Sequence, residues 1–319
     1  MTELQKIKTH IARPEILKRK RHSLFKIIPR ELIYPPFYWF LAYRHHVPGL
    51  HIQALIYFLG LRLLTRGKIR FVASRKLLSS PMDSVRYFEF DFFYRCFSNH
   101  SDFNTYLDVS SPRLFPALVM QKFPKIKVTM VNPDIKDLNI TKELFSACRF
   151  ENRCTFFGTS IDNLNLPRET FNIITSISVI EHIPADGDLA ALKKMWNLLK
   201  PNGKLLLSVP CAHTAFEEYI DFNEYGLLTP DKDSYVYGQR FYDKKILQDR
   251  FWSITGPPVN AAVYGEKREG FFMNNRQERL ISSNYPFWRE PYMMGLNYRK
   301  YDSIDDLPGV GVIALEFSK

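Results

Sequence analysis

The sequence predicts an α/β fold in which a mostly parallel sheet carries helices on both faces. Short β-prone runs alternate with amphipathic helical segments from residue 105 to the C-terminus. Residues 105–116 read as strand, turn and helix, with Asp108 near the end of the strand, and residues 171–210 read as two strands around one helix. Such alternation gathers the carboxyl ends of parallel strands, where ligands bind, at one edge of the sheet.

Charge separates an N-terminal extension, residues 1–80, from a predicted catalytic domain, residues 81–319. The extension holds 16 Lys and Arg against 3 Asp and Glu, a net charge of +13, whereas the remaining residues hold 28 against 30, a net −2. A near-neutral catalytic domain argues against a nucleic-acid channel running through it.

The extension reads as an arm followed by a helix. The basic run at residues 18–22 favours a solvated arm. Residues 34–68 are aromatic and apolar, but prolines and charges leave no run of about 18 apolar residues, so no spanning helix is expected. Residues 50–64 suit a helix with a wide apolar face. That face could pack on the catalytic domain, cover the active site as a lid, or lie on a membrane surface, and we favour packing or lid.

The remaining elements follow in order. We expect an amphipathic helix within residues 81–100 and later helices at 112–123, 140–150, 188–200 and 242–251. Strands are expected at 105–109, 127–133, 154–160, within 171–183, and at 204–210, 260–266 and 310–319. The last two strands lack a full helix between them, which predicts an antiparallel pair. At the first turn, Ser111 can cap the following helix and Pro112 suits its first position.

The four cysteines, Cys96, Cys148, Cys154 and Cys211, show no C-x-x-C spacing. Without a signal peptide they read as reduced thiols of a cytoplasmic protein, one that could also sit at the inner face of a membrane. No cluster of Asp, Glu or His has recognisable ligand spacing, so no metal is expected.

The order of motifs resembles class I S-adenosylmethionine-dependent methyltransferases of the methyltransferase-11-like type, over roughly residues 100–319. Residues 171–210, FNIITSISVIEHIPADGDLAALKKMWNLLKPNGKLLLSVP, are similar to that family's fourth strand with its Glu-His-Ile ending, the next helix, the Lys-Pro-x-Gly turn and the fifth strand. The resemblance implies a Rossmann-like sheet of seven strands with an antiparallel last strand, methyl transfer, and S-adenosyl-L-methionine as cofactor.

The first turn departs from the family pattern. Its three glycine positions are Ser110, Pro112 and Leu114, and Asn132 replaces the acidic residue that ends the second strand. Either the cofactor still binds through a substituted turn, which we favour, or the pocket has decayed and leaves a catalytically inactive subunit. The resemblance implies cofactor contacts from Asp108, Ser110, Ser111, Asn132, Ser160, Ile161 and Ser176.

Candidate bases lie on the loops after the fourth and fifth predicted strands. Glu181 and His182 follow the fourth, and His213 follows the fifth. Histidine's ordinary pKa near 6.5 suits a base at neutral pH. For His182, a structural bond to the backbone is as plausible as catalysis, whereas the polar loop around His213 favours function.

Two inserts complete the domain. Residues 211–242 form a long, tyrosine-rich segment, expected to line a substrate pocket with Tyr219, Tyr235, Tyr237 and Arg240. Residues 265–305 could add to the pocket or form a homodimer contact. We therefore expect methyl transfer, on oxygen, to a small-molecule, lipid-like or peptide acceptor in a biosynthetic pathway. The alternatives are the inactive subunit and a protein that binds a membrane surface through residues 1–80.

Overall fold

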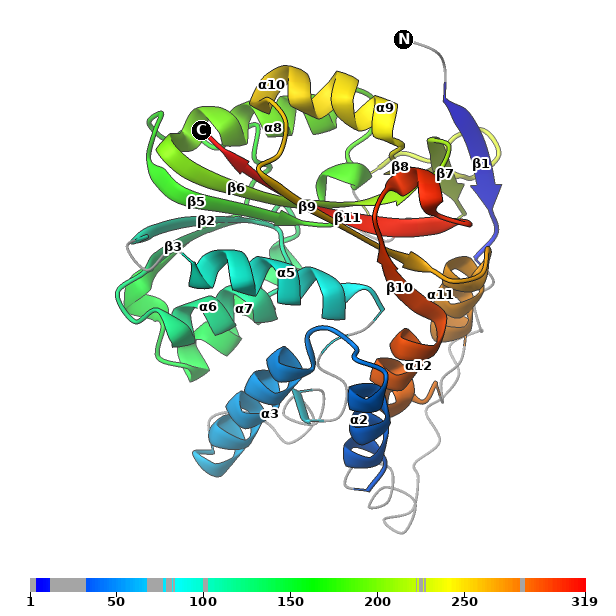
Figure 1. Cartoon of the computed structure of the whole chain (residues 1–319). Helices are drawn as coiled ribbons and strands as arrows, with labels where there is room; N and C mark the ends of the chain where they lie inside the picture. The colour runs from blue at the N-terminus through cyan, green and yellow to red at the C-terminus, as the bar shows by residue number, and fades with distance from the viewer. Residues whose placement is uncertain are drawn as a thin grey trace. The chain divides into compact units, whose positions relative to one another are not determined.

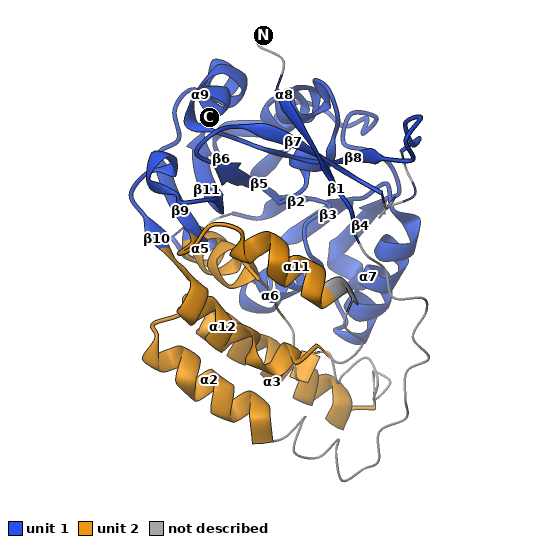
Figure 2. Cartoon of the chain, turned by 90° about the vertical axis from the view of Figure 1, so that its right-hand side faces the viewer, with its two compact units in different colours: residues 1–11, 96–265, 300–319 blue, residues 12–95, 266–299 orange. Residues whose placement is uncertain are grey.

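A computed structural model describes residues 4–11, 33–67, 77, 78, 82, 84–99, 103–221, 223, 226, 228–281 and 285–319. The chain divides into two compact units, which Figure 2 colours separately. The first comprises residues 1–11, 96–265 and 300–319, and the second comprises residues 12–95 and 266–299. The predicted domain boundary at residue 80 stays a prediction, because a division into compact units does not establish which segments fold independently.

The first unit is built on one mixed sheet (Figure 1). Its strand order is β10 (Tyr298–Tyr301), β9 (Asn260–Glu266), β11 (Val310–Ser318), β6 (Leu199–Ala212), β5 (Phe171–Ile177), β2 (Thr105–Val109), β3 (Lys127–Val131) and β4 (Cys154–Phe157). The pairs from β6 to β4 are parallel, whereas β11 is antiparallel to both β6 and β9. The predicted α/β class and the antiparallel last strand are confirmed. The count of seven strands falls one short, because the four-residue β10 joins the edge.

Helices cover both faces of this sheet. Figure 1 shows α6 (Leu114–Lys122) and α7 (Ile135–Ala147) on one face, and α8 (Gly187–Leu198), α9 (Lys244–Leu247) and α10 (Ser253–Thr255) on the other. Helix α7 begins five residues earlier than predicted, because the Asp134 side chain accepts the N–H groups of Lys136 and Asp137. Short helical turns complete the set: η2 (Glu151–Arg153), η3 (Ile180–His182), the π-helix η4 (Gln248–Trp252), η5 (Phe287–Arg289) and η6 (Ile304–Asp306).

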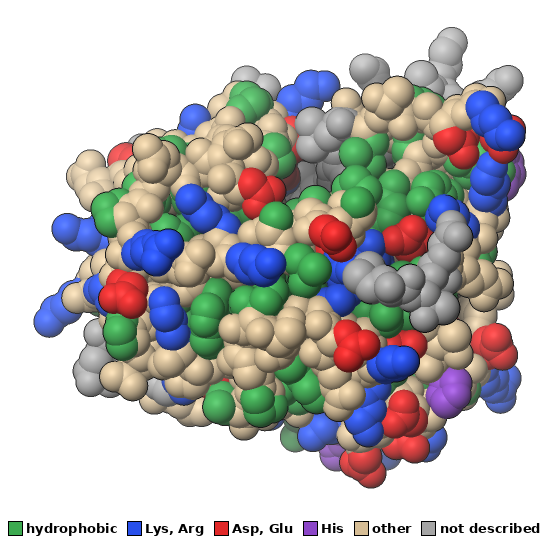
Figure 3. All heavy atoms as spheres, turned by 90° about the horizontal axis from the view of Figure 1, so that it is seen from above, with side chains coloured by type: hydrophobic (Ala, Val, Ile, Leu, Met, Phe, Trp, Pro, Cys, Tyr) green, Lys and Arg blue, Asp and Glu red, His purple; other side chains and the backbone are tan. Residues whose placement is uncertain are grey.

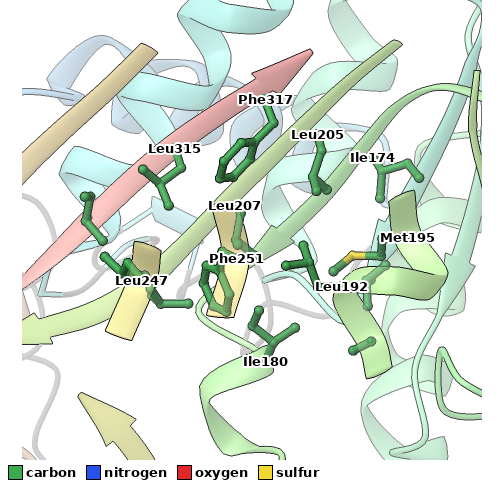
Figure 4. Packing of buried hydrophobic residues seen from close by; sticks show 14 of the residues in the cluster. Ile174, Ile180, Leu192, Met195, Leu205, Leu207, Leu247, Phe251, Leu315 and Phe317 are labelled. Carbon is green, nitrogen blue, oxygen red and sulfur yellow. The ribbon is translucent and has the colours of Figure 1, made fainter. Parts of the chain in front are cut away.

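The main core lies between the sheet and the α8 side (Figure 4). Leu205, Leu207 and Phe317 point from the strands toward Leu192 and Phe251, and all five side chains are fully buried. Burying one such side chain stabilises the fold by about 1.5 to 3 kcal/mol. Apolar side chains therefore fill the space between this face of the sheet and its helices. Polar side chains that could bind a ligand are expected at the ends of the strands.

The predicted insert at residues 211–242 contains two strands. Strand β7 (Phe216–Ile220) pairs with β8 (Val236–Phe241) in an antiparallel hairpin, and β1 (Gln5–Thr9) adds to β7 in parallel. No strand was predicted in this insert, and the pairing of β1 with β7 joins residues that are far apart in the sequence.

The second unit contains helices from both ends of the chain. Helices α2 (Tyr34–Arg44) and α3 (Leu50–Thr65) come from the predicted extension, and α11 (Phe271–Ile281) and α12 (Glu290–Asn297) come from the predicted second insert. The apolar face of α3 is buried, and its predicted packing on the catalytic domain or role as a lid stays a prediction. Helix α5 (Arg86–Ser98) runs from this unit into the first. The basic run at residues 18–22 lies outside the described residues.

Two observations bear on membranes and nucleic acids. Among the helices that the structure describes, none has the length and apolar character needed to span a bilayer. On the face seen from above in Figure 3, basic, acidic and apolar side chains are interspersed. Such a mixture differs from the one-sign stripe typical of a nucleic-acid interface.

Candidate active site

The strand order places a topological switch point between β2 and β5. The chain leaves β2 toward β3 on one side and later returns to β5 on the other. In open α/β sheets, ligands bind outside the carboxyl ends of the strands at such a point. Asp108 is the next-to-last residue of β2, Ser110 and Ser111 follow the strand, and Thr175 is opposite Asp108 on β5.

Asp108 is fully buried within a cluster of hydroxyl groups. Its Oδ1 lies 3.0 Å from the Tyr106 hydroxyl and 3.1 Å from the Thr175 hydroxyl, which are themselves 2.7 Å apart. Burial raises the pKa of Asp108 to about 7, against the opposing influence of the nearby Ser111, Tyr106 and Thr175 donors. The other oxygen, Oδ2, is buried with no hydrogen-bond partner among the described residues. A buried acceptor of this kind is suited to a ligand's donor group.

The turn after β2 retains a glycine-like backbone without glycine. Ser110 has a φ of 52°, and both its N–H and its hydroxyl donate to the Val131 carbonyl. The predicted cap by Ser111 is wrong: α6 begins at Leu114 with Arg113 before it and no side-chain cap. The Ser111 hydroxyl instead accepts the N–H of Ile177 at 3.2 Å. This bond ties the first turn to the end of β5.

Asn132 lies just after β3, and both halves of its amide are engaged. Oδ1 accepts the Asp134 N–H at 2.9 Å, and Nδ2 donates to the Asp137 carboxylate at 3.1 Å. Asp137 also pairs with Arg113. Each half of an amide can form a second hydrogen bond, so Asn132 retains one donor and one acceptor for a ligand.

The remaining predicted cofactor residues, Ser160, Ile161 and Ser176, lie after β4 and on β5. Ile161 is almost fully buried in the main core, and Ser160 precedes it after β4. Ser176 is buried on β5, and its hydroxyl has no hydrogen-bond partner among the described residues. Because side chains alternate along a strand, Ser176 faces the side of the sheet opposite Thr175. Tyr106 and Thr175 were not predicted, although the two-residue spacing of Tyr106 and Asp108 could have indicated a shared face.

His182 is held by backbone on β8. Its Nδ1 lies 2.6 Å from the Gly238 carbonyl oxygen, and a carbonyl only accepts, so Nδ1 carries the proton. In the neutral ring, Nε2 is then the basic nitrogen, and it lies 3.8 Å from the Glu181 carboxylate. Glu181 is buried, and its carbonyl accepts the Tyr237 hydroxyl at 2.9 Å. Strand β8 thus positions both residues of the predicted Glu-His pair.

His213 belongs to a different environment. It is exposed, and its Nδ1 lies 3.2 Å from the Asp305 carbonyl oxygen. It lines a surface hollow with Asp243, Lys244, Lys245, Gln248 and Asp305. The role of His213 as a base stays a prediction.

Arg240 is almost fully buried in an ion-pair network at the start of α8. It donates to Asp188 at 2.6 Å and to Glu217 at 2.7 Å, and Arg250 and Tyr242 also donate to Asp188. These bonds favour a positioning role over the predicted contact with substrate. The predicted tyrosines lie on or beside the β7–β8 hairpin: Tyr219 packs edge-on against Tyr237, and Lys8 lies over Tyr235.

No group of three or more His, Cys, Asp or Glu side chains within the described ranges is arranged to hold a metal ion.

Comparisons with known proteins point to one family. A family model described as "Methyltransferase domain" matches residues 90–252. The chain is similar in fold to the solved structure of the MccD protein, with 13% identity, a TM-score of 0.49, and coverage of 73% of this chain and 96% of that one. A [4+2]-cyclase, SpnF, gives 14% identity, a TM-score of 0.43, and coverage of 70% and 80%.

A third similar structure is the geranyl diphosphate C-methyltransferase of Streptomyces coelicolor A3(2), solved with Mg2+, geranyl diphosphate and S-adenosyl-L-homocysteine. It gives 9% identity, a TM-score of 0.45, and coverage of 71% of this chain and 76% of that one. No curated protein matches the chain.

Proposed function

Because the chain belongs to the methyltransferase domain family, whose cofactor is S-adenosyl-L-methionine, we propose that it methylates an oxygen atom of a small-molecule or lipid-like acceptor. One observation carries the proposal. Asp108, with its Oδ2 unpartnered among the described residues, lies in β2, and His182, with a fixed ring tautomer, lies in η3, which follows the adjacent strand β5. This is the edge at which a donor and an acceptor would meet.

The residues around Asp108 suit the cofactor. When bound, S-adenosyl-L-methionine supplies a methyl group activated by a positively charged sulfur. Asp108 Oδ2 would accept from its amino group, and Asn132 would offer its remaining donor and acceptor to the ribose hydroxyls. The left-handed Ser110 would keep the backbone close, as glycine does in this turn.

His182 would act as the general base. An acceptor hydroxyl must lose its proton as the oxygen–methyl bond forms, and the Nε2 of a neutral His182 can take it. The Gly238 carbonyl holds the ring in the required tautomer, and the buried Glu181 carboxylate 3.8 Å away would stabilise the resulting imidazolium. A positioned base of this kind contributes roughly 10²- to 10⁴-fold to the rate.

Calorimetry with S-adenosyl-L-homocysteine tests cofactor binding on the full chain. We expect the wild type to bind, Asp108→Ala to bind at least about tenfold more weakly because a charge-assisted hydrogen bond is lost, and the exposed Asp302→Asn to bind like the wild type. No heat of binding for the wild type at millimolar ligand would contradict the proposal and favour the inactive subunit.

Transfer itself is tested with radiolabelled methyl donor and pooled small-molecule and lipid extracts. Label that appears in an extract fraction, and resists acid hydrolysis as an ether or is released by base as an ester, would support transfer to oxygen. Label found on nitrogen or carbon would overturn the choice of oxygen while leaving methyl transfer intact.

A further inference from the structure

Helix α2 exposes an aromatic face. Phe37, Phe40 and Tyr43 are 54%, 57% and 70% exposed, and Ile33 at the start of the helix is 59% exposed. Half of the large hydrophobic side chains that are exposed within the described residues lie between positions 33 and 43. Single exposed apolar residues are ordinary on a protein surface, but a contiguous group marks an interaction site.

Helical spacing places Ile33, Phe37 and Phe40 on one side, with Tyr43 at its edge. Positions 33, 37, 40 and 44 are separated by four, three and four residues, which puts Ile33, Phe37, Phe40 and Arg44 along one stripe. The opposite side is packed within the second unit: Pro35 and Ala42 are buried, and the Tyr38 ring lies 5.9 Å from that of Tyr292 on α12. Helix α2 is therefore apolar on two sides, and the described residues of its own unit cover one of them.

The segment that carries the stripe has charge of one sign. Residues 33–67 contain no Asp or Glu, and Arg44, Arg62 and Arg66 are exposed, with His45 and His46 beside Arg44. A two-fold dimer through this face would bring like charges from both copies together without an acidic residue of this segment to balance them. Anionic lipid headgroups would neutralise them instead.

We propose that the outer face of α2 docks on an anionic lipid surface. Phe37, Phe40 and Tyr43 would insert their rings at the boundary between headgroups and acyl chains, and Arg44 would contact the headgroups. The helix would lie along the surface. This proposal does not depend on the methyl-transfer reaction.

Flotation of the full chain with vesicles of phosphatidylcholine and phosphatidylserine at 7:3 tests the proposal. The variant Phe37→Ser/Phe40→Ser should partition at least about tenfold less than the wild type, because binding scales with buried apolar area. A matched control is Ile140→Ser/Val259→Ser, whose side chains are 48% and 61% exposed and lie in the first unit. It should float like the wild type. Binding should also fall with added salt and on pure phosphatidylcholine vesicles.

Equal partitioning of the wild type and Phe37→Ser/Phe40→Ser would overturn the proposal. So would a concentration-dependent dimer, seen by light scattering, that Phe37→Ser/Phe40→Ser abolishes while vesicle binding persists; that result would assign the face to a second copy. If the double variant fails to fold, Phe40→Trp provides a second readout. Lipids brominated on the acyl chain should quench its added fluorescence, and an unquenched signal with the protein on the vesicle would contradict insertion.

Discussion

The Nδ1 of His182 lies 2.6 Å from the carbonyl oxygen of Gly238, which joins the turn after β5 to a strand 56 residues later. The contact fixes the ring's tautomer, and it is also what a purely structural histidine would make. The two roles, left open by the sequence, can be separated because they depend on different nitrogens of the ring.

Replacing His182 by Asn should separate the two roles. The Asn amide can still donate to the Gly238 carbonyl, so the variant should remain within about 1 kcal/mol of the wild type in stability. It has no basic nitrogen, so methyl transfer to a hydroxyl should fall by roughly 10²- to 10⁴-fold. Urea unfolding and a radiolabel transfer assay measure the two effects. Full activity in His182→Asn would mean that His182 has a structural role and is not the general base.

Asp108 should make stability depend on pH. The pKa of Asp108 is raised to about 7 in the folded protein, above its value near 3.9 in the unfolded chain. The folded state therefore binds more protons between those two values, and the contribution of Asp108 to stability falls as pH rises through this window. A shift of about three units corresponds to roughly 4 kcal/mol, an order-of-magnitude figure.

The measurement compares Asp108→Asn with the wild type by urea unfolding at pH 5, 6, 7 and 8. Relative to the wild type, Asp108→Asn should gain stability with each step up to pH 7 and then level off, because Asn cannot ionise. Asp302→Asn, on the surface, should track the wild type at every pH. A constant difference between Asp108→Asn and the wild type would show that Asp108 does not titrate in this range.

Local patterns predicted the central sheet well. Strand β2 was predicted with its observed limits because Tyr106, Leu107 and Val109 form a buried run between turn residues. Strand β1 was missed because its pairing with β7 joins residues more than 200 positions apart. The predicted cap by Ser111 was wrong for the same reason. The N–H of Ile177, 66 residues away, donates a hydrogen bond to the Ser111 hydroxyl. Local sequence patterns cannot show which hydrogen-bond partner far along the chain a residue will have.

The candidate site was predicted only in part, for a related reason. Asp108 and His182 lie at strand ends that sequence order alone identifies. Their partners, Thr175 and Gly238, depend on strand register and on a hairpin that folds back onto the turn. In the structure, Arg240 on the same hairpin donates to the carboxylates of Asp188 and Glu217. The sequence around Arg240 had instead predicted a cation that faces the substrate.

Removing Arg240 should destabilise the protein. Arg240→Gln would leave Asp188, which is fully buried, with Arg250 as its remaining arginine partner, and it would remove the bond to Glu217. Breaking one partner of a buried ion pair costs about 3 to 5 kcal/mol. Urea unfolding should show this loss, and Arg168→Gln, at an exposed position, should change stability by less than about 0.5 kcal/mol. Wild-type stability with weakened acceptor binding in Arg240→Gln would instead support the predicted substrate contact.

Two glycines of the second unit test how closely its backbone is packed. Gly49 and Gly67 both have positive φ, 74° and 62°, so an Ala at either position is strained by about 1 to 2 kcal/mol. At Gly49 the added Cβ would also lie 2.1 Å from the Tyr87 carbonyl oxygen, whereas at Gly67 no atom lies within 4 Å. Gly67→Ala should therefore show the backbone strain alone. Gly49→Ala should lose at least about 3 kcal/mol, because the backbone of Tyr87 must also move. Similar unfolding curves for Gly49→Ala and Gly67→Ala would mean that α3 and α5 do not approach as closely as Gly49 and Tyr87 indicate.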